Sequence, residues 1–204
     1  GGYFGVITLR RALATSRNIP ALKAFQQVDN KKIVEMVTNL GITPEISGGR
    51  IHEAHSLGAF TGVSPLQMAA AYSAFGNGGY YNEPYSVTRI VDRTTGESHE
   101  HSEDNYVVKR RAMSDATAFM ITSVLQDVSL NGGTPKNMAV KTGTTNYDAK
   151  TMRDRGLPDD AIRDSWLVGY STKTAVAMWY GYEYIDPYYC LHNFPDSRRK
   201  DQIF

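Results

Sequence analysis

Strand-like segments are gathered near the end of this chain, after a long stretch with helix signals. Residues 138–145, 165–170 and 174–182 have strand character, and Ser171-Thr172-Lys173 supplies a hairpin turn between the last two. Because strands joined by short turns pair antiparallel, this order predicts helices first and a compact antiparallel sheet after them. The predicted fold class is therefore α+β, with an antiparallel sheet flanked by helices, rather than a doubly wound parallel sheet.

Helix starts can be placed in the part of the chain before the strands. Ser64 is the clearest, because Pro65 follows at the first helical position and Gln67 completes a capping box. Four polar residues are placed as N-caps ahead of apolar residues at three- and four-residue steps, namely Thr8, Asp29, Ser64 and Ser114.

A proline interrupts the first helical segment. Pro20 disfavours helix at the residue before it, which predicts a helix–helix turn at Ser16-Arg17-Asn18 and a short helix over 21–26. Charged residues 97–110 and polar residues 146–164 are predicted to form surface loops. We expect a mainly helical part over 1–135 and a strand part over 136–185 within one unit spanning 1–204.

Charge and cysteine content exclude some classes of function. Lys and Arg number 22 and Asp and Glu 21, for a net charge of +1, so the composition predicts no nucleic-acid partner. Cys190 is the single cysteine, so no disulfide can form within the chain.

Lys141-Thr142-Gly143 on the first predicted strand is the most informative motif. The Lys supplies positive charge, the Thr hydroxyl can bind a carboxylate, and Gly lets a ligand approach the strand closely. A substrate could then add to that edge as an antiparallel strand. A phosphate-binding loop is excluded because Val140 stands where that motif needs Gly. A solvated Lys beside an ordinary strand Gly is the alternative interpretation.

Ser16-Arg17-Asn18 offers a hydroxyl and an amide at a predicted helix–helix turn. A polar helix end with satisfied hydrogen bonds would explain it equally well. Together with Lys141-Thr142-Gly143, and in this order, it resembles the signature of serine acyltransferases, S-x-x-K, S-D-N and K-T-G. The stretches 3–13, 64–72 and 166–170 resemble the transpeptidase domain of class A, bifunctional penicillin-binding proteins.

One element of that signature departs from the family pattern. The single S-x-x-K string, Ser197-Arg198-Arg199-Lys200, follows K-T-G instead of preceding S-x-N, so we interpret it as a coincidence. We therefore expect a transpeptidase-like fold that is incomplete at both ends. The nucleophilic Ser and its Lys partner would lie outside this chain, and the fragment alone would be inactive.

The resemblance implies three catalytic residues. Lys141 would supply positive potential that helps to hold the donor and favours a deprotonated hydroxyl nearby. Ser16 would relay a proton to the leaving amine, and Asn18 would hold the acyl amide of the donor.

It also implies three substrate-binding residues on the K-T-G strand. The hydroxyls of Thr142 and Thr144 would bind the donor carboxylate, and the backbone N–H of Thr144 would contribute to the oxyanion hole. Gly143 would keep the strand edge open for the substrate.

By the same resemblance, the intact protein would be a peptidoglycan D,D-transpeptidase. It would transfer acyl groups from D-Ala-D-Ala stem peptides of lipid II-derived glycan strands, and β-lactam antibiotics would acylate it. Its further partner would be the remainder of the domain, which carries S-x-x-K. The resemblance implies no cofactor or metal. It implies a place at the extracytoplasmic face of the bacterial cell membrane, anchored by a segment outside this chain.

Two alternatives stay open. A β-lactam-binding sensor or catalytically retired domain would bind the ligand without turnover. A D,D-carboxypeptidase or β-lactamase would hydrolyse the acyl-enzyme and would need a carboxylate that activates water. The candidate carboxylates in 146–164 are Asp148, Asp154, Asp159 and Asp160.

His52-Glu53-Ala54-His55 comes close to a zinc motif. The H-E-x-x-H pattern needs its second His one place later, where Ser56 stands, so two surface histidines are the favoured interpretation.

Overall fold

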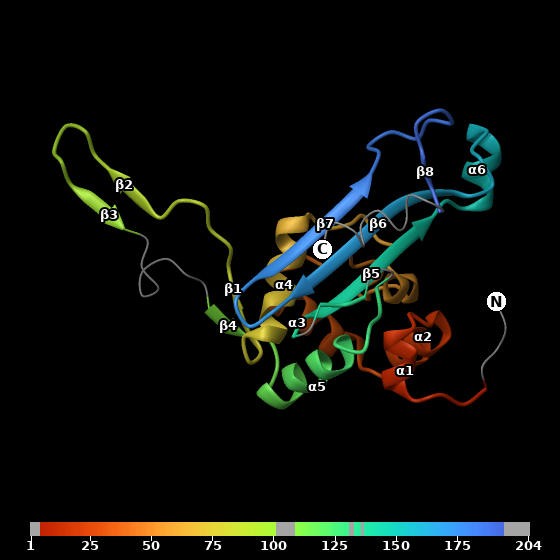
Figure 1. The fold of residues 1–204 in the computed structure, drawn as a ribbon, viewed down its shortest axis with the longest axis horizontal. Coiled ribbons are helices and arrows are strands. Elements are labelled where there is room, and N and C mark those ends of the chain that lie inside the picture. Colours follow the sequence, from red (N-terminus) through yellow and green to blue (C-terminus); the bar gives the residue numbers. More distant parts are fainter. Residues whose placement is uncertain (1–4, 101–108, 131–132, 136, 194–204) are drawn as a thin grey trace.

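The computed structural model describes residues 5–100, 109–130, 133–135 and 137–193. In these ranges most helices precede the main sheet and two of them pack against it, whereas the hairpin within residues 89–100 projects away from the body (Figure 1). The helices are α1 (Leu9–Ala14), α2 (Asn18–Gln26), α3 (Asn30–Asn39), the 3-10 helix η1 (Glu53–Leu57), α4 (Pro65–Gly76), α5 (Asp115–Leu125) and α6 (Ala149–Arg155). The strands are β1 (Tyr80–Asn82), β2 (Arg89–Val91), β3 (Ser98–Glu100), β4 (Lys109–Arg111), β5 (Ala139–Asn146), β6 (Ala161–Tyr170), β7 (Ala175–Gly181) and β8 (Leu191–His192).

The main sheet has the order β5-β6-β7, and β8 pairs with the start of β6. All of its pairs are antiparallel, and Lys141 lies opposite Val168 while Gly143 lies opposite Trp166. The helix α4 packs against β6 and β7, and α5 packs against β5. The prediction of an α+β fold with an antiparallel sheet flanked by helices is confirmed.

All four predicted N-caps are confirmed. The side chain of each accepts a hydrogen bond from a backbone N–H in the first turn, and Ser64 with Gln67 forms the complete capping box of α4. N-caps can be predicted from sequence because the cap side chain bonds to an N–H within four residues and needs no distant partner.

The first helical segment differs from its prediction. The helix α2 begins at Asn18 rather than at residue 21, so Pro20 lies inside its first turn. A proline is tolerated there because the first backbone N–H groups of a helix have no carbonyl partner within the helix.

Two predicted surface loops contain regular structure. The segment 97–110 holds β3 and the start of β4, and 146–164 holds α6 and the start of β6. The cap of α6 is Asp148, whose carboxylate accepts from the N–H groups of Lys150 and Thr151, and Gly156 ends the helix at φ 63°. A seven-residue helix with few apolar positions gives little periodic signal, which explains why it was missed.

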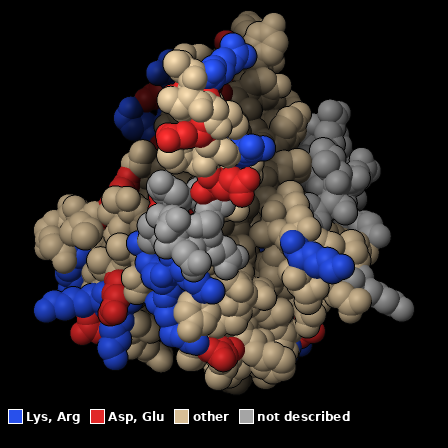
Figure 2. Space-filling model, turned by 90° about the vertical axis from the view of Figure 1, so that its left-hand side faces the viewer, with Lys and Arg blue, Asp and Glu red and all other residues tan. Residues whose placement is uncertain are grey.

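An arm leaves the body between β1 and β4, which pair antiparallel with Tyr81 opposite Arg110. The β2–β3 hairpin lies within this arm, and Arg89 on β2 pairs with Ser98 and Glu100 on β3. Figure 2 views the molecule from this end and shows acidic and basic side chains interspersed over it.

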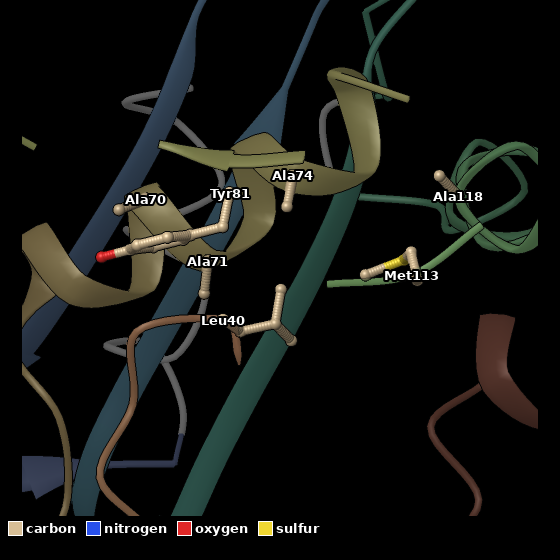
Figure 3. Packing of buried hydrophobic residues seen from close by; sticks show 7 residues of the cluster. All are labelled: Leu40, Ala70, Ala71, Ala74, Tyr81, Met113 and Ala118. Atoms are coloured by element: carbon tan, nitrogen blue, oxygen red, sulfur yellow. The ribbon is translucent and has the colours of Figure 1, made fainter. Parts of the chain in front are cut away.

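The first core cluster surrounds α4. Ala74 of this helix is fully buried, and Tyr81 and Leu40 reach it from β1 and from the end of α3 (Figure 3). Small side chains on α4 let these neighbours approach closely. The buried members are Leu40, Ala70, Ala71, Ala74, Tyr81, Met113 and Ala118.

A second cluster joins α5 to the sheet. Leu125 of α5 packs with Val140 of β5 and with Leu167 and Tyr170 of β6, and both Val140 and Leu167 are fully buried. The hydroxyls of Tyr170 and Thr122 share a hydrogen bond of 2.8 Å, which satisfies both groups at this boundary. The K-T-G strand is thereby fixed against the helical part.

Two further findings concern membrane-spanning helices and the S-x-x-K string. A membrane-spanning helix needs a longer apolar stretch than any helix within the ranges given above provides. The string Ser197-Arg198-Arg199-Lys200 lies outside the described residues.

Candidate functional site

Lys141 and Ser16 meet across the molecule. The ammonium Nζ of Lys141 on β5 donates a hydrogen bond to Oγ of Ser16, 125 residues away in the sequence. The same ammonium donates to the carbonyl oxygen of Thr142 at 2.7 Å. The two motifs identified in the sequence are therefore brought together through a charge-assisted hydrogen bond, which is stronger than a neutral one.

Ser16 has a strained backbone. Its φ is 52°, in the left-handed region that residues with a Cβ seldom adopt. The turn is closed by hydrogen bonds from the N–H of Ser16 to Leu13 (3.1 Å) and from the N–H of Arg17 to Ala12 (2.9 Å). Such strain persists only where the surroundings hold it, and it is concentrated at functional sites.

Arg10 holds the helix that leads into this turn. Its guanidinium donates to Asp127 Oδ2 (2.8 Å), to the carbonyl of Ser123 (2.8 Å) and to Ser123 Oγ (2.9 Å), beside the end of α5. Sequence reasoning missed this positioning role. An arginine on a helix gives no local signal when its partners lie more than 100 residues away.

A cavity of about 760 Å³ opens beside the K-T-G strand. Its lining includes the four residues from Lys141 to Thr144 on β5, Trp166 on β6, Tyr72 on α4, and the loop 57–63 that connects η1 to α4. Among the described residues, Ser16 and Asn18 are not part of this lining. Asn18 is exposed at the first position of α2, two residues beyond Ser16.

The strand β5 occupies one end of the described sheet order and pairs with β6 on one side. Thr142 and Gly143 are half-buried and Thr144 is exposed. A Cβ added at Gly143 would lie 3.3 Å from Cβ of Trp166, so a larger residue there would crowd β6. Packing against Trp166 is thus a second reason for glycine, beside the access to the strand that the sequence suggested.

Tyr72 contributes a neutral hydroxyl to the cavity wall. Burial raises the pKa of Tyr72 to about 12, and the neighbouring Tyr170 adds to the shift. The two rings are 6.4 Å apart between centroids in an edge-on arrangement. Tyr72 therefore cannot serve as an anionic base near neutral pH, and the charged side chains of the cavity lining are those of Lys141, Asp148, Arg163 and Asp164.

Three of the four candidate carboxylates, all but Asp159, have structural partners among the described residues. Asp148 caps α6, and the hydroxyl and N–H of Thr151 hold the pKa of Asp148 below its usual range. Asp154 pairs with Lys150 one turn earlier, and Asp160 pairs with His192 at 3.0 Å. These contacts explain the three acidic side chains without a role in activating water.

The two histidines of the near-zinc motif also have local partners. Nδ1 of His52 accepts the N–H of Ala54 and so caps η1, while Nε2 of His55 lies 3.6 Å from a carboxylate oxygen of Glu45. Sequence reasoning gave Glu45 no role.

Comparison with known proteins places the chain in a family. Residues 2–186 match the family described as the penicillin binding protein transpeptidase domain. The chain is 43% identical over 190 residues to penicillin-binding protein 1A/1B of Bacillus subtilis and 34% identical over 196 residues to penicillin-binding protein 1A of Streptococcus pneumoniae. These matches cover 88% and 89% of this chain, but only 20% and 26% of the two relatives.

Solved structures show the same fold. The penicillin-binding protein PonA1 of Mycobacterium tuberculosis matches with a TM-score of 0.70 and 21% identity, over 86% of this chain and 47% of that one. The penicillin G acyl-enzyme complex of penicillin-binding protein A from M. tuberculosis matches with a TM-score of 0.65 and 18% identity, over 99% of this chain and 48% of that one. The chain thus belongs to the transpeptidase domain family of penicillin-binding proteins, in its class A, PBP1A-like branch.

Proposed function

We propose that the intact protein is a peptidoglycan D,D-transpeptidase and that this chain supplies two of its three catalytic motifs. The observation that carries the proposal is the hydrogen bond from Lys141 to Ser16, which joins the K-T-G and S-x-N motifs. The reaction is acyl transfer in two steps: a serine takes the acyl group of a D-Ala-D-Ala stem peptide, and an amine of a neighbouring stem then takes it from the serine.

The nucleophilic serine and its lysine partner come from a segment outside these 204 residues. The S-x-x-K string at Ser197 has the wrong order along the chain for this role. The chain alone therefore forms no acyl-enzyme. The matched stretch makes up only 20% and 26% of the two curated relatives, which leaves room for the missing motif in the intact protein.

Proton transfer is assigned to the Lys141–Ser16 pair. The ammonium of Lys141 donates to Ser16 Oγ, so the Ser16 hydroxyl is left with its own proton to give to the leaving amine. The positive charge also stabilises a negatively charged oxygen that develops beside it. Asn18, at the start of the next helix, holds the acyl amide of the donor.

Donor binding is assigned to the edge of β5. The donor peptide lies along this strand in an extended form, with its terminal carboxylate on the hydroxyls of Thr142 and Thr144. The N–H of Thr144 contributes to the oxyanion hole, and Gly143 adds no side chain on the strand between them.

The partners follow from the same chemistry. They are D-Ala-D-Ala stem peptides on lipid II-derived glycan strands and, as inhibitors, β-lactam antibiotics. Solved structures of penicillin-binding protein A from M. tuberculosis are described as ceftriaxone, imipenem and penicillin G acyl-enzyme complexes. This reaction places the intact protein at the extracytoplasmic face of the bacterial cell membrane, anchored by a segment outside this chain.

The test is intact mass spectrometry after incubation with benzylpenicillin. We expect a penicilloyl adduct on the intact protein, mapped to a serine before Ser16, and none on the 204-residue chain. An adduct on this chain at Ser197 would overturn the assignment of the nucleophile. An intact protein that binds no penicillin covalently would overturn the proposed function.

Variants at Lys141 test the observation that carries the proposal. A hydrogen bond to a charged group contributes about 1.5–3 kcal/mol. Loss of such a bond from the transition state predicts that Lys141→Met in the intact protein slows acylation roughly 10–150-fold. Lys141→Arg keeps the charge and should lose less. Lys150→Met removes an exposed lysine from α6 and serves as the matched control.

Product analysis separates the alternatives. Incubating the intact protein with stem peptides should give crosslinked dimers. A stable penicilloyl adduct without any peptide turnover would favour the sensor or retired domain, and release of D-Ala without dimers would favour the carboxypeptidase.

A further inference from the structure

The loop 57–63 forms a wall of the cavity that also contains the K-T-G strand. It has no helix or strand of its own beyond the last residue of η1. Its position must therefore come from contacts at its ends and along its length, and those contacts decide how far it lies from Lys141.

Both ends of the loop are fixed locally. At its start, Gly58 ends η1 in the left-handed region at φ 90°, and the N–H of Ala59 bonds to the carbonyl of Ala54 at 3.1 Å. At its finish, the capping box of Ser64 and Gln67 starts α4.

The middle of the loop is attached through Glu45. Carboxylate oxygen Oε1 of Glu45 accepts the backbone N–H of Thr61 at 2.8 Å. The other oxygen, Oε2, lies 3.6 Å from Nε2 of His55 on η1. The ring of Phe60 lies 5.9 Å from the ring of His55, so the loop also packs on the residue to which Glu45 is anchored.

We propose that Glu45 is a positioning residue of the transpeptidase site. Its carboxylate joins Thr61 to His55 and so fixes the loop 57–63 relative to η1. The loop lines the same cavity as the K-T-G strand, so its position sets the shape of that cavity. This inference rests on the proposed function, since acylation is the step it affects. Glu45 does not touch the reacting atoms; it acts through the loop.

Removing the Glu45 carboxylate should slow acylation strongly while it lowers the unfolding temperature only slightly. Glu45 and His55 are 42% and 17% exposed, and a pair of this exposure contributes little to folding. Misplacing a site wall by about 1 Å can nevertheless slow a reaction by up to about 100-fold. We expect Glu45→Ala to slow acylation by at least about tenfold while the unfolding temperature falls by less than about 4 °C.

A conservative variant and a matched control separate positioning from destabilisation. In Glu45→Gln the amide oxygen can still accept the N–H of Thr61, so acylation should stay within about threefold of the wild type. Asn30→Ala removes two hydrogen bonds of 3.0 Å to Ile51. Ile51 lies in the same α3–η1 connection as Glu45, but its bonds to Asn30 do not involve Thr61. It should lower the unfolding temperature at least as much as Glu45→Ala, with little effect on acylation.

The experiment uses the intact protein and benzylpenicillin, with acylation rates and hydrogen exchange of residues 57–63 measured for each variant. Faster exchange and slower acylation in Glu45→Ala, with recovery of both in Glu45→Gln, would support the proposal. Equal acylation in Glu45→Ala and wild type, or an equal loss in Asn30→Ala, would overturn it.

Hydrogen exchange tests the role of Glu45 separately from the proposed function, because it can be measured whether or not the protein is acylated. If the wild type itself forms no adduct, the function is refuted and the catalytic part of the inference falls with it. Unchanged exchange in Glu45→Ala would refute the attachment of the loop whether or not the protein is acylated.

Discussion

Two adjacent glycines after α4 allow a prediction with a built-in control. Gly78 and Gly79 have φ of 58° and 87°, so alanine would be strained at both. A Cβ at Gly78 meets nothing within 4 Å, whereas a Cβ at Gly79 would lie 2.2 Å from the carbonyl oxygen of Met113. That carbonyl belongs to backbone that is itself fixed, because the N–H of Met113 bonds to the carbonyl of Gly79 at 3.2 Å.

The two costs can be separated. Left-handed φ costs a residue with a Cβ roughly 1–2 kcal/mol at either position. The overlap at Gly79 adds roughly 1–3 kcal/mol, as overpacking does elsewhere. With about 2–4 °C per kcal/mol for a domain of this size, Gly78→Ala should lower Tm by roughly 2–8 °C and Gly79→Ala by roughly 4–20 °C.

Calorimetry of the intact protein, following the transition of this domain, measures both values. The informative quantity is the difference between the variants, because the φ term is common to both. Equal shifts would refute the reasoning, since they would mean that the backbone around Met113 moves aside freely. A larger loss in Gly78→Ala would contradict it outright.

Two further predictions concern pH and the support of the Ser16 turn. Burial raises the pKa of Tyr72 from 10.0 to about 12, so above pH 10 the unfolded chain loses this proton first and stability falls. Tyr72→Phe should abolish roughly 2 kcal/mol of the loss between pH 9 and pH 11.5, measured by urea unfolding; identical losses would contradict this. Arg10→Met removes three hydrogen bonds between α1 and α5 and should cost about 1 kcal/mol. It should also slow penicillin acylation because α1 leads into Ser16, whereas Arg11→Met, exposed on the same helix, should not.

Much of the fold could be predicted because its signals are local. A cap such as Ser64 is satisfied by the N–H of Gln67, three residues away, and the β6–β7 hairpin is closed by a turn of only a few residues. The prediction failed where the signal was short or ambiguous. Pro20 predicts that the second helix starts at residue 21, whereas α2 begins at Asn18 with Pro20 in its first turn, and α6 has too few apolar positions to show a period.

Some residues of the candidate site could be predicted from sequence motifs, and others could not. Lys141 and Ser16 could be chosen from their motifs, and the structure brings them into contact. The catalytic roles of Asn18, Thr142, Gly143 and Thr144 stay predictions. Arg10 and Glu45 could not be found, because each acts through a contact with a residue that gives no pattern in the sequence.

The α+β class, the helix caps, the two motifs and their family can be predicted from the amino-acid order, because each depends on neighbouring residues or on residue types in a fixed order. Which distant groups meet depends on the folded chain: Lys141 with Ser16, Arg10 with Asp127, and Glu45 with Thr61. Those contacts follow from how α1, α5 and the sheet pack together, and that packing depends on the sum of many weak apolar contacts that no single segment encodes.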